Sequence, residues 1–354
     1  MPRAPVRTTD IPPNATIRDV AAKAGVSVAT VSRVFNQKGP IREATVRRVM
    51  DVAGALQYIP HAGARSLSTR STRTIGVVLP DLHGEFFSEV IRGIDLAARE
   101  SGYHLLLSGS HSDRDEMRAV VQAVRGMVDG LIVMSPDLEP SALVGELPAG
   151  IPTVLLNAKV DGRPSITIDN AGGARDVVRH LASLGHKHIA FIGGPAKNAD
   201  AEQRRRGFRA GAKAHGVDPV ELTGNFTEDS GYEAGKAIAA MSPRPTAVFA
   251  ANDSMAIGAL SAFRDARVRV PDHIALVGFD DIPIARFLDP PLTTVKVPIA
   301  ELGRRGLQIL LSGDTQATQA ARLETSLVVR RSCGAQQSGV KQGLKQNRKS
   351  QKKR

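Results

Sequence analysis

The chain of 354 residues is 42% apolar and 23% charged, a composition that excludes collagen-like, coiled-coil and wholly disordered proteins. Its single cysteine excludes a disulfide framework and a multi-cysteine zinc site. No apolar run reaches the ~18 residues of a membrane span, and the N-terminus lacks the apolar core of a secretory signal, so we expect a soluble cytoplasmic protein without a membrane partner. The net charge of +12 is concentrated at the ends, with +8 in residues 1–75, +7 in residues 341–354 and −3 in the rest, which predicts contacts with a polyanion.

The first predicted element is a pair of short helices in residues 16–36, TIRDVAAKAGVSVATVSRVFN. Thr16 precedes Asp19 by three residues, which is the spacing of a capping box that begins a helix. Gly25 can take the left-handed conformation that ends this helix, and Ser27 stands where an N-cap belongs for the second helix. The pattern predicts a helix–turn–helix, although any amphipathic helix pair in a helical domain would share it.

The second helix of this pair has one apolar and one polar face. The apolar stripe that we expect to be buried consists of Val31, Val34 and Phe35. The opposite face can enter the major groove of DNA and carries Ala29, Ser32, Arg33 and Asn36. Arg33 can form two hydrogen bonds with a guanine, while Val28 and Ala29 are small and apolar enough to contact thymine methyl groups.

A third helix is predicted over residues 43–57. It ends before Pro60, because the residue before a proline avoids helical geometry. The three helices define a predicted headpiece of residues 16–59, and residues 60–73 are predicted to link it to the rest of the chain.

The two-helix segment, followed by LQYIPHAGARSL at residues 56–67, resembles the DNA-binding headpiece and hinge of the lactose-repressor (LacI/GalR) family, and the resemblance extends over about residues 16–332. It implies that Val28, Ala29 and Arg33 read bases. It also implies that the hinge folds into a helix on DNA, with Leu67 as a wedge between base steps of the minor groove. The predicted DNA-contacting residues are Thr16, Ser27, Val28, Ala29, Thr30, Ser32, Arg33, Asn36, Arg65 and Leu67.

Two residues depart from the pattern of that family. Arg42 stands where the family usually has a serine cap, so we expect the third helix to fray at its start. Gly63 lies inside the predicted hinge helix, where a glycine costs about 1 kcal/mol of helix propensity relative to alanine. We therefore expect the folding of this hinge to depend more steeply on DNA than is usual in that family.

From residue 74 onward, apolar runs typical of strands alternate with helical segments, which predicts parallel sheets covered by helices on both faces. The predicted strands are TIGVVLP, HLLLSGS, GLIVM, TVLLN, SITID, HIAFIGG, AVFAAND and IALVGFD. The predicted helices are residues 88–101, 113–127, 170–184, 202–215, 230–240 and 253–265. The length of residues 74–332 favours two lobes, with the last segments crossing back to complete them.

The resemblance implies a periplasmic-binding-protein type I fold, with the first lobe ending near Asp169. The predicted fold class is thus an all-α helix–turn–helix headpiece joined to an α/β two-lobed periplasmic-binding-protein type I-like domain. In open parallel sheets a ligand binds at the carboxyl ends of the strands. Here those ends carry amides, carboxylates and an arginine near aromatic rings, a combination that suits a polyhydroxylated ligand.

The predicted effector-binding residues are Phe86, Phe87, Ser135, Asn157, Arg204, Phe226, Asn252 and Asp280. The resemblance points to Arg204 as the effector arginine and to Phe226 as a ring that stacks on a sugar, and Asp253 is expected to cap the helix that follows it. Each Asp or Asn could instead be a cap or turn residue, and Phe86 and Phe87 could be ordinary core residues. A sugar, a sugar acid, a phosphorylated sugar, a purine and a nucleoside all stay open as effectors.

Enzyme motifs are weak in this sequence. It has no Walker A or GxSxG motif, and Gly193-Gly194-Pro195 lacks an N–H that a phosphate cradle needs. His186 and His188 have poor spacing for a metal site. We predict no catalytic residue, no metal ligand and no cofactor.

These features predict a transcriptional regulator, usually a repressor, that binds a pseudopalindromic operator in double-stranded DNA as a homodimer and responds to a small sugar-like effector. A transport protein that binds sugars and a nucleoid-type architectural protein are the alternatives. Residues 1–15 are expected to be a flexible arm, and residues 333–354 a basic disordered tail or an auxiliary DNA-binding arm. The tail lacks the leucine heptads of a tetramerising segment, which favours a dimer.

Overall fold

The computed structural model of the protein describes residues 15–36, 39–58, 71–148, 150–313 and 321–335. Most of the predicted N-terminal arm, the hinge with Gly63, Arg65 and Leu67, and the tail from residue 336 lie outside the described residues. The contacts divide the chain into two units, Met1–Arg73 and Thr74–Arg354, and each is described by itself.

The first unit is a three-helix headpiece made of α1 (Ile17–Ala24), α2 (Val28–Asn36) and α3 (Glu43–Ala55). Its small core is built from one fully buried valine of each helix, Val20, Val31 and Val49. The predicted helix–turn–helix is confirmed, and the third helix ends two residues earlier than predicted.

The first helix begins with the predicted capping box. Asp19 accepts a hydrogen bond from the Thr16 backbone N–H at 2.8 Å, and Thr16 Oγ1 accepts one from the Asp19 N–H at 3.4 Å. Gly25 follows the helix with a φ of 63°, the left-handed conformation that glycine takes without strain. At α3, by contrast, Arg42 is the N-cap and forms no side-chain cap hydrogen bond.

Replacing Thr16 by alanine is expected to destabilise α1 by about 1 kcal/mol, because two backbone N–H groups lose their partners or the geometry that holds them. Hydrogen exchange in the full chain should show the α1 amides opening about fivefold faster. The matched control is Thr45→Ala inside α3, which should leave the α1 rates unchanged. Unchanged α1 rates in Thr16→Ala would mean that the capping box does not stabilise the helix.

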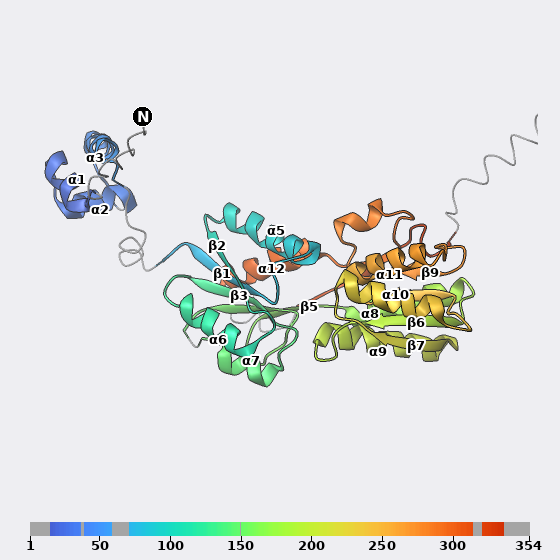
Figure 1. The fold of residues 1–354 in the computed structure, drawn as a ribbon. Helices are drawn as coiled ribbons and strands as arrows, with labels where there is room; N and C mark the ends of the chain where they lie inside the picture. Colours follow the sequence, from blue (N-terminus) through green and yellow to red (C-terminus); the bar gives the residue numbers. More distant parts are fainter. Residues whose placement is uncertain (1–14, 37–38, 59–70, 149, 314–320, 336–354) are drawn as a thin grey trace, which may run out of the picture. The chain divides into compact units, whose positions relative to one another are not determined.

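The first lobe of the second unit is built on a parallel six-stranded sheet in the order β11-β5-β4-β3-β1-β2. Its strands are β1 (Thr74–Leu79), β2 (His104–Gly109), β3 (Gly130–Met134), β4 (Thr153–Leu156), β5 (Ser165–Ile168) and β11 (Ala321–Leu323). Helices α5 (Glu85–Glu100) and α12 (Ile299–Ser312) cover one face, and α6 (Arg114–Ala123) and α7 (Pro140–Glu146) cover the other (Figure 1). The sheet is therefore buried on both faces, as continuous apolar runs such as GLIVM predict.

The second lobe has a parallel four-stranded sheet in the order β7-β6-β8-β9. Its strands are β6 (His188–Gly193), β7 (Asp218–Thr223), β8 (Ala247–Ala250) and β9 (Ala275–Val277). The helices pack as two pairs, α8 (Asn170–Ser183) with α9 (Ala199–His215) and α10 (Glu228–Ala240) with α11 (Asp253–Asp265) (Figure 1). A short antiparallel pair of β10 (Thr294–Lys296) and β12 (Ser326–Val328) and the 3₁₀ helix η1 (Pro283–Phe287) complete this lobe.

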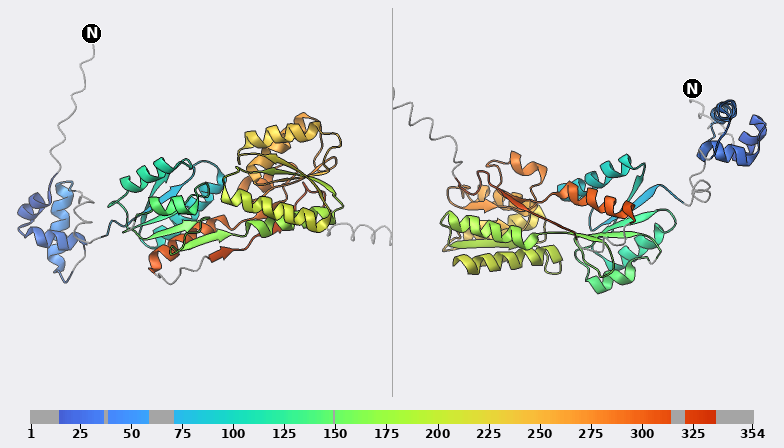
Figure 2. Two further views of the ribbon diagram at one scale, coloured as in Figure 1. Left: turned by 90° about the horizontal axis from the view of Figure 1, so that it is seen from below. Right: turned by 180° about the vertical axis from the view of Figure 1, so that it is seen from behind.

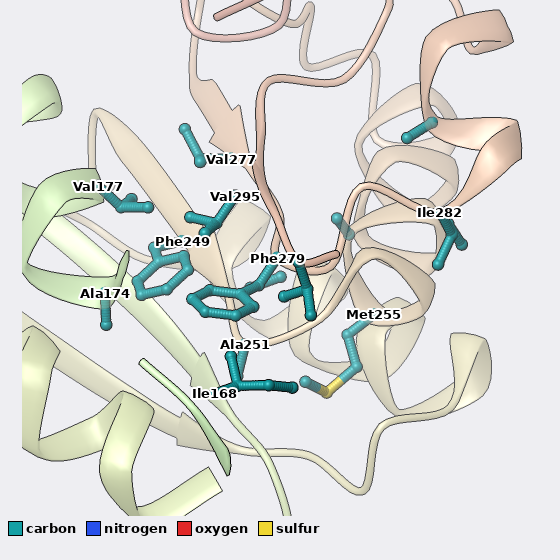
Figure 3. Close-up of a cluster of buried hydrophobic side chains, with 14 of the residues drawn as sticks. Ile168, Ala174, Val177, Phe249, Ala251, Met255, Val277, Phe279, Ile282 and Val295 are labelled. Atoms are coloured by element: carbon teal, nitrogen blue, oxygen red, sulfur yellow. The ribbon is translucent and has the colours of Figure 1, made fainter. Parts of the chain in front are cut away.

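The chain passes between the lobes after β5, after β10 and after β11 (Figure 2). The prediction that the last segments return to complete both lobes is confirmed, because α12 and β11 belong to the first lobe and β12 pairs within the second. One buried apolar cluster contains side chains of both lobes. In Figure 3, Ile168 at the end of β5 lies near Phe279 and Phe249 of the second lobe, whose ring centroids are 6.4 Å apart.

Helices α5 and α12 lie side by side because both have a glycine at their contact (Figure 1). A Cβ atom on Gly93 would come within 1.9 Å of the Ala300 carbonyl oxygen, and one on Gly303 within 2.3 Å of the Val90 carbonyl oxygen. No larger residue fits at either position without a shift of the backbone, so α12, the last of the described helices, packs closely against α5, the first helix of the lobe.

The predicted strands and helices of this unit are all present. Strand β3 and helix α11 have the predicted ends, and the others are shifted at one or both ends. Helix α7, the short strands β10, β11 and β12, and the edge strand β7 were not predicted. Strand β7 alternates exposed and half-buried residues and contains Pro219, so it lacks a buried apolar run. Helix α9 begins at Ala199 rather than 202, because Asn198 caps it through hydrogen bonds from the N–H groups of Asp200 and Ala201.

Candidate functional site

The side chains on the predicted groove-reading face of α2 do not pack in the core of the headpiece. Ala29 and Arg33 are exposed, Val28 is 42% exposed, and Val31 and Val34 are buried on the other side of the helix. The helix thus presents a cation and two small apolar side chains to a partner, as a groove-reading helix requires.

Other predicted DNA-contacting residues also have local structural roles. Ser27 Oγ accepts a hydrogen bond from the Thr30 N–H at 3.1 Å, and Asn36 Nδ2 donates one to Ser32 Oγ at 3.3 Å. These bonds fix the start and the end of α2. The contact of each residue with DNA stays a prediction, and Arg65 and Leu67 lie outside the described residues.

In the second unit, a cavity of about 450 Å³ lies between the lobes at the carboxyl ends of their strands. Seven of the eight predicted effector residues line it, namely Phe86, Phe87, Asn157, Arg204, Phe226, Asn252 and Asp280. Ser135 is the exception, because it is 1% exposed and absent from the lining, whereas its neighbours Met134 and Pro136 line the cavity. The end of β3 thus turns Met134 and Pro136 to the cavity and Ser135 away from it, and a contact of Ser135 with an effector stays a prediction.

Arg204 is the central cation of the cavity and is 3% exposed. Its Nε donates to Asn170 Oδ1 at 2.8 Å, and its Nη1 donates to the Ala251 carbonyl oxygen at 2.5 Å. Its Nη2 lies 3.0 Å from Asp280 Oδ1 in a buried ion pair. The guanidinium also lies over the Phe279 ring, 3.9 Å from its centroid. These contacts fix the arginine without an effector.

Asp200 is a buried carboxylate that the sequence analysis missed. It accepts hydrogen bonds from Asn157 Nδ2 at 2.9 Å and Asn170 Nδ2 at 2.7 Å. Burial raises the pKa of Asp200 to about 6, opposed by the charge of Arg204. Burial likewise raises the pKa of Asp280 to about 6, again opposed by Arg204. Asp200 and Arg204 are four residues apart in the sequence, a spacing that places both on one face of a helix. This spacing could have indicated that the two charges lie close together.

Among the described residues, four hydrogen bonds join the lobes at the cavity. One is the Asn157–Asp200 bond, and the second runs from Asn198 Nδ2 to Asp137 Oδ1 at 2.9 Å. The backbone N–H of Ala199 donates to the Pro136 carbonyl oxygen at 2.9 Å, and the Ile284 N–H donates to Glu85 at 3.0 Å. Glu85 therefore binds the opposite lobe.

The capping role predicted for Asp253 belongs to its neighbour Asn252, which also lines the cavity. Asn252 is the N-cap of α11, since its Oδ1 accepts from the Met255 N–H at 3.0 Å, and its Nδ2 donates to the Phe226 carbonyl oxygen at 2.9 Å. Asp253 was predicted as the cap and is fully buried instead. It accepts from the Ile282 N–H at 3.0 Å and from Thr294 Oγ1 at 2.6 Å. The prediction was wrong because Asn252 has the extended backbone of a cap, while Asp253 is the first helical residue.

The aromatic residues both line the cavity and pack against the core, and their contact with an effector stays a prediction. Phe86 and Phe87 line the cavity, pack against the main apolar cluster and meet edge to face with centroids 5.5 Å apart. Phe226 has a φ of 71° and lies with its centroid 5.8 Å from the Arg204 guanidinium carbon. Its ring is thus held beside the central cation.

Two family profiles match the chain. The profile "Bacterial regulatory proteins, lacI family" matches residues 16–61, and the profile "Periplasmic binding protein-like domain" matches residues 178–333. The ribose operon repressor of Escherichia coli strain K12 is 36% identical over 323 residues, which is 89% of this chain and 98% of that protein. The chain belongs to the LacI family. The predicted resemblance and the role of a DNA-binding transcriptional regulator are confirmed.

Further LacI-family relatives span most of the chain. The repressor CytR of Escherichia coli strain K12 is 34% identical over 330 residues, covering 91% of this chain and 97% of CytR. The structure of the Lac repressor dimer bound to operator and the anti-inducer ONPF has a TM-score of 0.83 at 30% identity and covers 91% of this chain and 100% of that one. The predicted two-part fold is confirmed.

A LacI-family regulator from Enterococcus faecium, solved with bound ribose, has a TM-score of 0.67 at 26% identity and covers 73% of this chain and 98% of that one. The curated relatives named above are transcriptional repressors.

Among the described residues, no group of three or more His, Cys, Asp or Glu side chains could hold a metal ion. None of the described helices is both long and apolar enough to cross a membrane.

The two raised carboxylate pKa values of this LacI-family cavity predict a pH effect on stability. Between the ordinary pKa of 3.8 and about 6, the folded chain binds more protons at Asp200 than the unfolded chain does, so this contribution to stability falls as pH rises. Asp200→Asn removes it. The Tm of the variant minus that of the parent should therefore rise from about pH 4 to about pH 6 and then level off. The exposed Asp161→Asn is the control, and a constant difference for Asp200→Asn would contradict the assignment.

Proposed function

We propose that this LacI-family regulator is a repressor whose operator affinity is controlled by a small polar effector bound between its lobes. The observation that carries the proposal is a buried arginine, Arg204, held by carboxylate and amide groups in a cavity of about 450 Å³, in a chain with an exposed groove-reading helix. It acts in the cytoplasm, where the DNA is, and has no catalytic step.

On DNA, the protein acts as a homodimer on a pseudopalindromic operator, because one headpiece reads only a half-site. The Lac repressor is a dimer in its operator complex, which supports this assembly. Arg33 reads a guanine, Val28 and Ala29 contact thymine methyl groups, and Leu67 is the wedge at the centre of the operator.

In the cavity, the effector is a sugar or a sugar derivative. Arg204, Asn157 and Asp280 bond its hydroxyl groups, and Phe226 covers an apolar face of its ring. The relatives support this class, since one is named a ribose operon repressor and another was solved with ribose.

Control arises from the bonds that join the lobes. An effector that contacts both lobes changes the population in which Asn157–Asp200 and Asn198–Asp137 are bonded, and with it the separation of the paired hinges. To shift operator occupancy from 99:1 to 1:99, it must distinguish the two states by about 5.5 kcal/mol.

The test is a random-oligonucleotide selection with the purified full chain, followed by anisotropy measurements on the selected duplex with and without sugars and nucleosides. We expect a twofold-symmetric site and a dose-dependent change in its occupancy with at least one compound. Failure to select any sequence would reject the DNA-reading role. A selected site whose occupancy no small molecule changes would favour an architectural protein.

A further inference from the structure

The hydrogen-bond donors and acceptors of the cavity differ in how many already have a protein partner. This difference distinguishes among possible effectors. All three nitrogens of Arg204 have protein partners, since they contact Asn170, Ala251 and Asp280. The amide nitrogens of Asn157, Asn198 and Asn252 also each donate to a protein oxygen. The three nitrogens of Arg204 and these three amide nitrogens thus each already have a protein partner.

Acceptors, in contrast, are in surplus. Asn157 is 4% exposed, and its Oδ1 is buried and accepts no hydrogen bond from the described residues. Turning the Asn157 amide by 180° would not remove this unpaired acceptor, because the amide nitrogen would then lose its hydrogen bond to the Asp200 carboxylate. Asp280 Oδ1 has only its ion pair with Arg204. Buried acceptors without partners are expensive, so a ligand that donates hydrogen bonds gains most here.

The formal charges of the lining also favour a ligand without an anionic group. Its carboxylates are Asp81, Glu85, Asp137, Asp200, Glu228 and Asp280, and its one arginine is Arg204. The lining also contains His83 and His111, and no lysine is among its described residues. The arginine is already opposed by Asp280 at 3.0 Å. An anionic ligand would therefore lie near several carboxylates that have no arginine or lysine partner, and the lining offers no further arginine or lysine to bind it.

We infer that the effector of this cavity is a hydrogen-bond donor without an anionic group, either a neutral polyhydroxylated molecule or its amine-bearing derivative, and that sugar acids and phosphorylated sugars are excluded. The inference rests on the proposed function of the cavity as an effector site and narrows its ligand class. The hydroxyl or ammonium protons of such a ligand bond to Asn157 Oδ1 and to the carboxylates, and any positive charge is balanced by the lining.

The first test separates a small-molecule extract of bacterial cells by anion exchange and adds each fraction to the complex of the full chain with its selected operator. The unretained, neutral and cationic fraction should change operator occupancy, and the retained anions should not. Activity in the retained fraction alone would overturn the inference and leave the proposed function intact. Activity in neither fraction would overturn the proposed function, and the inference with it.

The second test compares ligands that differ in charge at nearly constant shape. Calorimetry on the full chain would use D-galactose, D-galacturonamide, D-galacturonate and D-galactosamine, and D-ribose with D-ribose 5-phosphate. Each anion should bind about 100-fold more weakly than its neutral counterpart, whereas the amine should bind as well or better. An anion that binds more tightly than its neutral counterpart would refute the inference.

A charge-neutralising variant distinguishes this electrostatic effect from simple damage. Asp200→Asn should raise the affinity of galacturonate relative to galacturonamide about tenfold, whereas a structural defect would weaken both ligands equally. Asp161→Asn, an exposed carboxylate outside the lining, is the matched control and should leave the ratio unchanged. An unchanged ratio in Asp200→Asn would mean that charge in the cavity does not select the ligand.

Discussion

Replacing Arg204 by methionine is expected to abolish the effector response and to lower the free energy of unfolding by about 3–5 kcal/mol. The side chain is buried and forms an ion pair with Asp280 at 3.0 Å, so its loss leaves a buried carboxylate without a cation. Urea unfolding of the full chain measures the stability, and operator anisotropy with and without effector measures the response.

A double variant separates the two effects. Arg204→Met combined with Asp280→Asn removes both charges, so part of the lost stability should return while the response stays absent. Arg204→Lys keeps the charge but loses the planar fork that bonds Asn170 and Ala251 together, and it should lose response with a smaller loss of stability. A double variant that responds with the parental dose dependence would remove both residues from the effector site.

Replacing Arg33 by alanine should weaken operator binding by about 1–3 kcal/mol for each half-site, or about 30-fold to 20,000-fold for a dimer on both. Arg33 is exposed on α2 beside Ala29, on the face opposite the buried Val31 and Val34. A two-hydrogen-bond contact with guanine would be lost, so preference at one operator position should relax.

The measurement is anisotropy on operator, on operator changed at single positions and on a scrambled duplex, at fixed salt. Arg48→Ala, which removes an exposed arginine from α3, is the matched control for the loss of charge. It should affect operator and scrambled DNA alike. If Arg33→Ala also weakens both duplexes equally, Arg33 contacts phosphate rather than a base.

The headpiece could be predicted from sequence because local signals determine it. The spacing of Thr16 and Asp19 begins α1, Gly25 ends it, and the stripe of Val31 and Val34 orients α2. Most strands of the lobes were equally predictable, because a buried parallel strand is a continuous apolar run. The edge strand β7 has no such run and was missed for that reason.

The cavity was only partly predictable, because its residues meet through the fold. Arg204 and Asp280 were identified from their motifs, but Asp200, Asp137 and Asn198 bond to residues distant in the sequence. No local pattern distinguishes such residues from helix caps, and Asn198 is indeed both a cap and a bridge between lobes. The wrong prediction of Asp253 as the cap of α11 has the same origin, since a shift of one residue in the start of the helix decides which side chain caps it.

The position of α12 has a consequence for biosynthesis. The four strands of the second lobe's sheet are complete once residue 277 has left the ribosome, whereas the first lobe waits for Ile299–Ser312 to cover Gly93 and for Ala321–Leu323 to pair with β5. The lobe that is translated first thus closes only after the sheet of the second lobe is complete, and during elongation it exposes an uncovered helix and an open strand edge. Nascent chains arrested before residue 299 should therefore be the species that chaperones bind and that aggregate.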